Sequence, residues 1–97
     1  MEEPAMQPGK EKTYLTVLAS IDRTGLMEPR EIIWPDGRRF AIERVDCWRT
    51  ALDHGPETTY YVVSIRGQKR ILYFTPSPNG IRSPVNLGRW YVETPVP

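Results

Sequence analysis

The chain has 97 residues, 39% of them hydrophobic and 26% charged, which fits one globular domain with a small core, and no stretch resembles a membrane span. Its formal charge of +1 and its pI of about 7.9 are lower than those of typical basic nucleic-acid-binding domains, whose pI exceeds about 9. Ten prolines, roughly double the usual share, argue against long helices and favour strands and turns.

The first twelve residues are rich in Pro, Glu, Lys and Gly and show no hydrophobic periodicity. Such a segment cannot bury enough apolar surface to order itself. We therefore predict a disordered tail over residues 1–12, a folded domain over 13–94 and a short tail over 95–97. The start also lacks the apolar region of a signal peptide, and a single cysteine, Cys47, allows no internal disulfide, so we expect a reducing, cytoplasmic location.

Alternating apolar residues predict six short strands. In chain order they cover residues 14–21, 31–34, 38–45, 59–66, 70–74 and 89–93. The first strand has apolar residues at four alternate positions, namely Leu15, Val17, Ala19 and Ile21. Asp36-Gly37 predicts a tight hairpin between the second and third strands, because glycine accepts the positive φ of such turns. A second hairpin is predicted at residues 67–69.

The third strand is less regular than the others. Phe40 and Ile42 share a face, but Val45 breaks the period of two, and a β-bulge near Glu43 or Arg44 would restore it to the inside. Residues 46–55 match both a strand and a helix. We expect the strand to continue to about residue 49 and a loop to follow, with a solvated turn at residues 53–55.

Six short strands with alternating faces predict an all-β fold, an antiparallel barrel that is closed or half-closed, because closure removes exposed strand edges. An SH3-like barrel is the first choice and an OB-like barrel the alternative. Residues 59–66 are apolar on both faces, whereas a barrel this small has one inside. A second layer or a partner must then cover the outer face, and a homodimer is the simplest partner.

Several motifs of the chain carry a resemblance to a group of proteins. They are Asp22-Arg23-Thr24-Gly25, the run from Ile32 to Ile42 with its Trp34-Pro35-Asp36-Gly37-Arg38 turn, Tyr61 to Ile65, and Trp90-Tyr91-Val92-Glu93. With these motifs the chain resembles a group of short, uncharacterised β-rich bacterial proteins, mainly from Firmicutes, over residues 14–93. The resemblance implies the fold and a bacterial cytoplasmic setting, and it transfers no catalytic residues.

Catalytic and metal chemistry find little support in the sequence. A Cys47–His54 pair would need a base within hydrogen-bond reach of the thiol, and a lone cysteine beside Trp48 is more often a core residue. Asp46, Cys47, Asp53 and His54 together match no zinc-ligand spacing. We therefore predict a protein that is not an enzyme, with no cofactor and no metal.

Basic and aromatic side chains flank the predicted strands and turns. The candidate binding surface comprises Trp34, Arg38, Arg39, Tyr60, Arg66, Lys69, Arg70 and Tyr73. Trp34 and Trp90 could line a groove for peptides, although capping of the core is the simpler interpretation. We predict a non-enzymatic binding module that interacts with a protein or with itself. The alternatives are a nucleic-acid-binding barrel, in which cations follow phosphates and aromatic rings stack bases, and an enzyme using Cys47 and His54.

Overall fold

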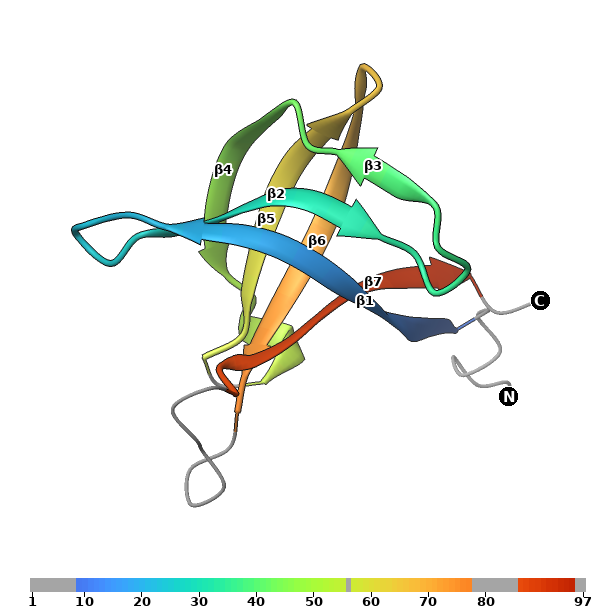
Figure 1. Ribbon diagram of the computed structural model, residues 1–97. Helices are drawn as coiled ribbons and strands as arrows, with labels where there is room; N and C mark the ends of the chain where they lie inside the picture. Colours follow the sequence, from blue (N-terminus) through green and yellow to red (C-terminus); the bar gives the residue numbers. More distant parts are fainter. Residues whose placement is uncertain (1–8, 56, 78–85, 96–97) are drawn as a thin grey trace.

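The chain folds as one curled antiparallel sheet that forms a half-barrel (Figure 1). The computed structural model describes residues 9–55, 57–77 and 86–95, and within these ranges the sheet has seven strands. The strands are β1 (Lys10–Ile21), β2 (Met27–Ile33), β3 (Arg39–Ala41), β4 (Arg44–Thr50), β5 (Thr59–Ile65), β6 (Gln68–Pro76) and β7 (Gly88–Pro95). A short 3-10 turn, η2 (Leu52–His54), follows β4. The prediction of an all-β antiparallel fold is confirmed.

Strands that are consecutive in the chain are neighbours in the sheet, except β3 and β4, and the first and last strands also pair with each other. Across the sheet the order is β3-β2-β1-β7-β6-β5-β4. β3 and β4 are consecutive in the chain but lie at opposite edges, so the seam of the half-barrel is between them. The sheet is therefore an up-and-down meander that β1 and β7 join in the middle.

The predicted strand over residues 38–45 is two strands, β3 and β4, which explains why seven strands form where six were expected. At the break the backbone N–H of Ile42 donates to the carbonyl of Arg30 at 2.9 Å, and that of Glu43 donates to the carbonyl of Ser64 at 2.8 Å. The chain thus passes from one sheet edge to the other within two residues. The bulge predicted near Glu43 or Arg44 lies instead at Asp46, where the register with β5 shifts.

β1 begins earlier than predicted. Lys10, Glu11 and Lys12 pair with the last residues of β7, in a ladder that reaches Pro95. The boundary between tail and domain at residue 12 was therefore wrong, because the polar start of β1 is held by hydrogen bonds to a strand distant in sequence rather than by apolar burial. Residues 1–8 lie outside the described residues.

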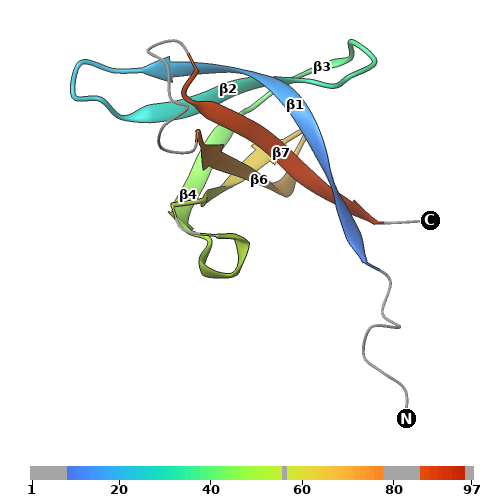
Figure 2. The ribbon, with the colours of Figure 1, turned by 90° about the horizontal axis from the view of Figure 1, so that it is seen from below.

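Only the first two of the alternate apolar residues in β1 pack on the core. Leu15 and Val17 pack against the core, but the register with β2 shifts after Leu18. Ala19 is exposed, and Ile21 keeps 57% of its surface exposed, so the apolar alternation continues beyond the part of β1 that packs on the core. Because β2 starts at Met27 instead of residue 31, the β1–β2 hairpin is long and extends beyond the core, as Figure 1 and Figure 2 show.

The core lies inside the curl of the sheet. Val63 and Leu72 are fully buried there, and Trp90 packs on Phe74 with 4.8 Å between ring centroids and on Tyr61 with 5.4 Å. Trp90 is thus a core residue. A second cluster covers part of the outer face and consists of Ala51, Tyr60, Tyr73 and Tyr91. The outer face of residues 59–66 is therefore partly covered by the chain itself.

Both predicted hairpins form. At the first, the backbone N–H of Trp34 donates to the carbonyl of Arg38 at 2.8 Å, and Gly37 has a φ of 94°. At the second, the loop is Arg66 and Gly67 instead of residues 67–69, with φ values of 52° and 77°, because Gln68 and Lys69 already pair with β5. Two successive positive φ angles are typical of a type I′ turn, whose twist matches that of the flanking strands.

Substitution of Gly88 tests how closely β6 and β7 approach at their paired ends. A Cβ at Gly88 would collide with the carbonyl oxygen of Thr75 and lie 2.8 Å from the Cα of Pro76, and the φ of Gly88 is 151°. We expect Gly88→Ala to lower the free energy of unfolding by about 3 kcal/mol through overpacking and backbone strain. Gly25→Ala, which also has a positive φ but opens into free space, should cost about 1 kcal/mol. Equal losses in urea denaturation would contradict this account.

Candidate ligand-binding cleft

The cleft arises because β6 and β7 pair over less than their full lengths. Their ladder joins Tyr73–Pro76 to Gly88–Tyr91. Beyond Tyr91, β7 pairs with β1, and before Tyr73, β6 pairs with β5. The two strands therefore diverge from the Tyr73–Tyr91 pair, and Figure 1 shows them running apart. Among the described residues, the edge of β6 over 68–72 has no strand partner on this side.

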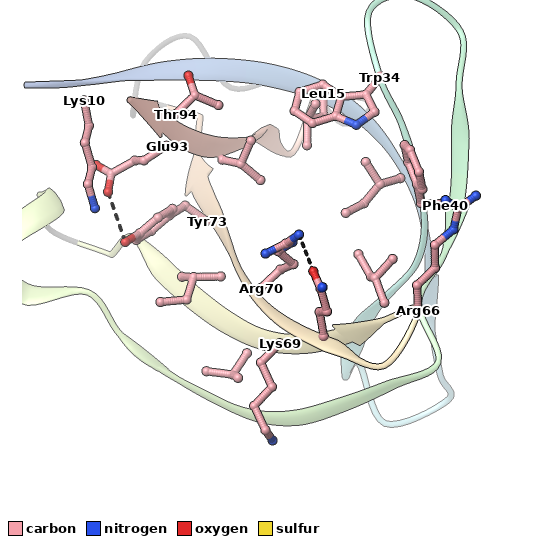
Figure 3. Close-up of a pocket in the computed structure, with 16 residues that line it drawn as sticks. Lys10, Leu15, Trp34, Phe40, Arg66, Lys69, Arg70, Tyr73, Glu93 and Thr94 are labelled. Atoms are coloured by element: carbon pink, nitrogen blue, oxygen red, sulfur yellow. Dashed lines mark hydrogen bonds between the residues drawn. The ribbon is translucent and has the colours of Figure 1, made fainter. Parts of the chain in front are cut away.

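A cleft of about 950 Å³ occupies this opening (Figure 3). Its apolar lining is formed by Leu15, Ile32, Phe40, Val62, Ile65, Ile71 and Val92. Its polar and aromatic lining is formed by Lys10, Trp34, Arg66, Gln68, Lys69, Arg70, Tyr73, Glu93 and Thr94. These residues come from six strands and two connecting turns, because the curl of the sheet brings β3 and the β2–β3 turn opposite β6.

Most of the binding surface predicted from the sequence lies in this cleft. Five of its residues line the cleft, namely Trp34, Arg66, Lys69, Arg70 and Tyr73. Arg38 lies beside it, over the rings of Trp34 and Phe40 at 5.9 and 5.8 Å. Arg39 does not line the cleft and instead donates two hydrogen bonds to Glu31, at 2.9 and 3.0 Å. Tyr60 packs in the outer aromatic cluster, so neither Arg39 nor Tyr60 belongs to this site.

The cations of the cleft are held in different ways. Arg66 lies over the ring of Phe40 at 5.1 Å. The Nζ of Lys69 donates to Asp46 at 3.1 Å, which directs this side chain toward β4. Bonds from Arg44, Lys69 and Ser64 lower the pKa of Asp46 to about 2, so this carboxylate stays charged and retains Lys69. Lys69 therefore acts mainly as a link between β4 and β6.

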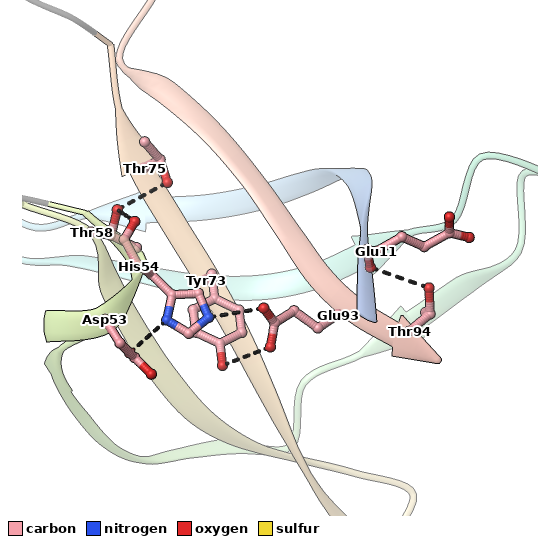
Figure 4. A network of polar contacts seen from close by, with 8 residues as sticks. All are labelled: Glu11, Asp53, His54, Thr58, Tyr73, Thr75, Glu93 and Thr94. Atoms are coloured by element: carbon pink, nitrogen blue, oxygen red, sulfur yellow. Dashed lines mark hydrogen bonds and ion pairs between the residues drawn. The ribbon is translucent and has the colours of Figure 1, made fainter. Parts of the chain in front are cut away.

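A polar network closes the narrow end of the cleft (Figure 4). His54 donates from Nε2 to Glu93 at 2.9 Å and from Nδ1 to Asp53 at 2.7 Å, and the Tyr73 hydroxyl donates to Glu93 at 3.3 Å. The imidazole also stacks on the Tyr73 ring, with 4.4 Å between centroids. Glu93 is the first outward-facing residue of β7 beyond the last β6–β7 pair. Because His54 of η2 bonds to Glu93 and stacks on Tyr73 of β6, η2 links the two strands where they separate.

The two carboxylates of this network favour the protonated, imidazolium form of His54. Burial lowers the pKa of His54, but its bonds to Asp53 and Glu93 raise it by more, and the result lies above the ordinary value of 6.5. Burial, with the charge of Glu93, raises the pKa of Tyr73 to about 12, which keeps its hydroxyl a donor. Only the doubly protonated ring can donate to both carboxylates at once.

The arrangement of His54 bears on the catalytic hypothesis. Both of its ring nitrogens are engaged by carboxylates, whereas Cys47 lies on a different surface with Glu28 and Trp48. His54 therefore does not serve as the base for a Cys47 thiol. Asp53 and Gly55 are exposed, as predicted for a solvated turn at residues 53–55, but the His54 side chain is only 17% exposed, so the prediction fails at His54. In the described part of the chain no three His, Cys, Asp or Glu side chains are grouped to hold a metal ion.

Sequence reasoning missed several residues of the cleft. Glu93 and Lys10 were placed in a terminal strand and a tail, and Phe40 and Ile71 were assigned only to strands. No known protein family, curated protein or solved structure matches the chain. The resemblance to the Firmicutes group therefore stays a prediction. Among the described residues, no helix has the length and apolar character needed to cross a membrane.

The His54 network predicts a pH dependence of stability. Because the pKa of His54 is raised in the folded state, its contribution is complete below its unfolded value and is lost as the pH rises through the folded value. His54 is the one histidine of the chain, so no other histidine adds to the difference between wild type and a His54 variant. We expect the difference in unfolding free energy between wild type and His54→Gln to shrink from about pH 6 to pH 8. A difference that is flat or grows in chemical denaturation over this range would refute the network.

Proposed function

We propose that this chain is a non-enzymatic binding module that holds an extended polypeptide segment in the β6–β7 cleft. One observation carries the proposal: the β6–β7 ladder ends at the Tyr73–Tyr91 pair, which leaves the edge of β6 over 68–72 without a strand partner on this side among the described residues. An open strand edge presents a row of backbone N–H and carbonyl groups, and an added strand satisfies them. Protein modules commonly bind peptides in this way.

The cleft also suits the side chains of such a segment. Val62 and Ile71 lie side by side in the β5–β6 register on one face of the open edge, and Ile71 is 48% exposed. Leu15 lies across the opening, is partly exposed and adds apolar surface. A bound strand would cover these residues, and burial of apolar surface would then contribute to affinity alongside the backbone hydrogen bonds.

Binding of single-stranded nucleic acid is the second candidate, supported by Lys10, Arg66 and Arg70 beside Trp34 and Tyr73. Bases stack on open aromatic faces in such proteins. Here the Tyr73 ring already stacks on His54 and on Tyr91, at 4.4 and 5.0 Å. Arg38 and Arg66 lie over the other rings of the cleft. Since these faces are occupied by the chain itself, the lining favours a polypeptide.

We also propose that the half-barrel is SH3-like. The meander order of its strands supports this choice, because the OB fold, the alternative, is a Greek-key barrel. Self-association remains part of the proposal, with a second copy as one source of the added strand. A cytoplasmic location is proposed as well, supported by the free thiol of Cys47.

A matched pair of substitutions tests the binding site. Peptides are first selected from a display library for binding to the full chain. They should bind Ile71→Gln about tenfold more weakly than wild type, because the variant lacks the apolar side chain that the bound strand would bury. Ile21→Gln removes a similarly exposed isoleucine from the β1–β2 hairpin and should leave affinity unchanged. Fluorescence anisotropy measures both. Selected peptides that bind both variants as tightly as wild type would place the site elsewhere.

A further inference from the structure

We propose that the segment bound in the cleft is acidic and adds as a strand beside β6, with carboxylates toward Arg66 and Arg70 and apolar side chains toward Ile71. This inference rests on the proposed function and names the chemistry of the partner. Three observations support it: the charge of the lining, the availability of Arg66 and Arg70 to a ligand, and the alternation of side chains along β6.

The lining carries an excess of positive charge. Its cations are Lys10, Arg66, Lys69 and Arg70. Among the described residues that line the cleft, Glu93 is the one carboxylate, and it already accepts hydrogen bonds from His54 and Tyr73. A cleft with walls of one charge sign concentrates ligands of the opposite sign. An anionic ligand is therefore favoured over a neutral or basic one.

Arg66 and Arg70 remain available to a ligand, whereas Lys69 does not. Lys69 is bound to Asp46, and Figure 3 shows it directed away from Arg70. Arg70 lies in the middle of the cleft, where its Nη2 donates to the side-chain oxygen of Gln68 at 2.6 Å. Within the described ranges neither Arg66 nor Arg70 forms an ion pair with a carboxylate. Their guanidinium groups can thus form the paired, charge-assisted hydrogen bonds that carboxylates accept.

The alternation along β6 sets the pattern of the ligand. Arg70 pairs with Val63 and shares the inner face with Leu72, whereas Ile71 pairs with Val62 on the outer face. A strand added beside β6 has the same period of two, and residues opposite one another share a face. The favoured segment therefore alternates acidic and apolar residues, with an acidic residue opposite Arg70 and an apolar residue opposite Ile71.

Three labelled peptides of about seven residues test this pattern. Each alternates valine with one other residue, which is glutamate, glutamine or lysine. Titrated with the full chain and followed by fluorescence anisotropy at low salt, the glutamate peptide should bind at least about tenfold more tightly than the lysine peptide. Its affinity should fall as salt is added, because part of it is electrostatic.

Charge variants assign the preference to the cleft. Arg70→Gln should weaken binding of the glutamate peptide about tenfold and change that of the glutamine peptide little, and Arg66→Gln should act in the same direction. Arg23→Gln makes the same charge change at the β1–β2 turn, outside the lining, and should have no effect. Far-UV circular dichroism checks that each variant is folded.

The outcomes separate the two proposals. Equal affinity for all three peptides would overturn the acidic preference and leave the polypeptide site intact. Failure of every peptide to bind a chain that sedimentation equilibrium shows to be monomeric would overturn both. Tighter binding of an oligothymidylate than of the glutamate peptide, lost in Arg70→Gln, would assign the cleft to nucleic acid. A dimer in sedimentation equilibrium that the glutamate peptide does not dissociate, with no peptide binding, would assign it to a second copy.

Discussion

Tyr91 holds the strands together where β6 and β7 separate, and the cleft depends on its packing. Its side chain is fully buried, stacks on Tyr73 at 5.0 Å and meets the edge of Tyr14 at 5.6 Å. One ring thereby joins β6, β7 and β1 at the last residue where β7 can pair with both neighbours. Past this point β7 follows β1, and the free edge of β6 is left facing the opening. His54 reinforces the junction through Glu93.

Local features of the fold were predictable from sequence because local chemistry decides them. Gly37 and Gly67 mark turns whose φ values need glycine, and the alternation over residues 59–66 suffices to define β5. Features set by pairing between distant segments were not predictable. The break at Ile42 exists because β3 and β4 take partners on opposite sheet edges, and the start of β1 at Lys10 depends on β7.

The site was predictable to a similar extent. Arg66, Arg70 and Trp34 were identifiable because cations and aromatic rings beside turns are commonly displayed on a surface. Their convergence depends on the curl of the sheet, which no local pattern encodes. The contact between His54 and Glu93 joins residues 39 positions apart, so it could not be read from spacing. A histidine in a polar turn gave no signal that its ring was half-buried and bonded to two carboxylates.

The open edge of β6 is the central claim, and nuclear Overhauser contacts across β6 and β7 in the free protein test it most directly. We expect backbone contacts between Phe74 and Trp90 and between Tyr73 and Tyr91, where the ladder exists. We expect none between Leu72 and Val92, and rapid hydrogen exchange for the amides over residues 68–72 that point away from β5. Backbone contacts between Leu72 and Val92, with protected amides along the whole of β6, would show a closed barrel and contradict the account.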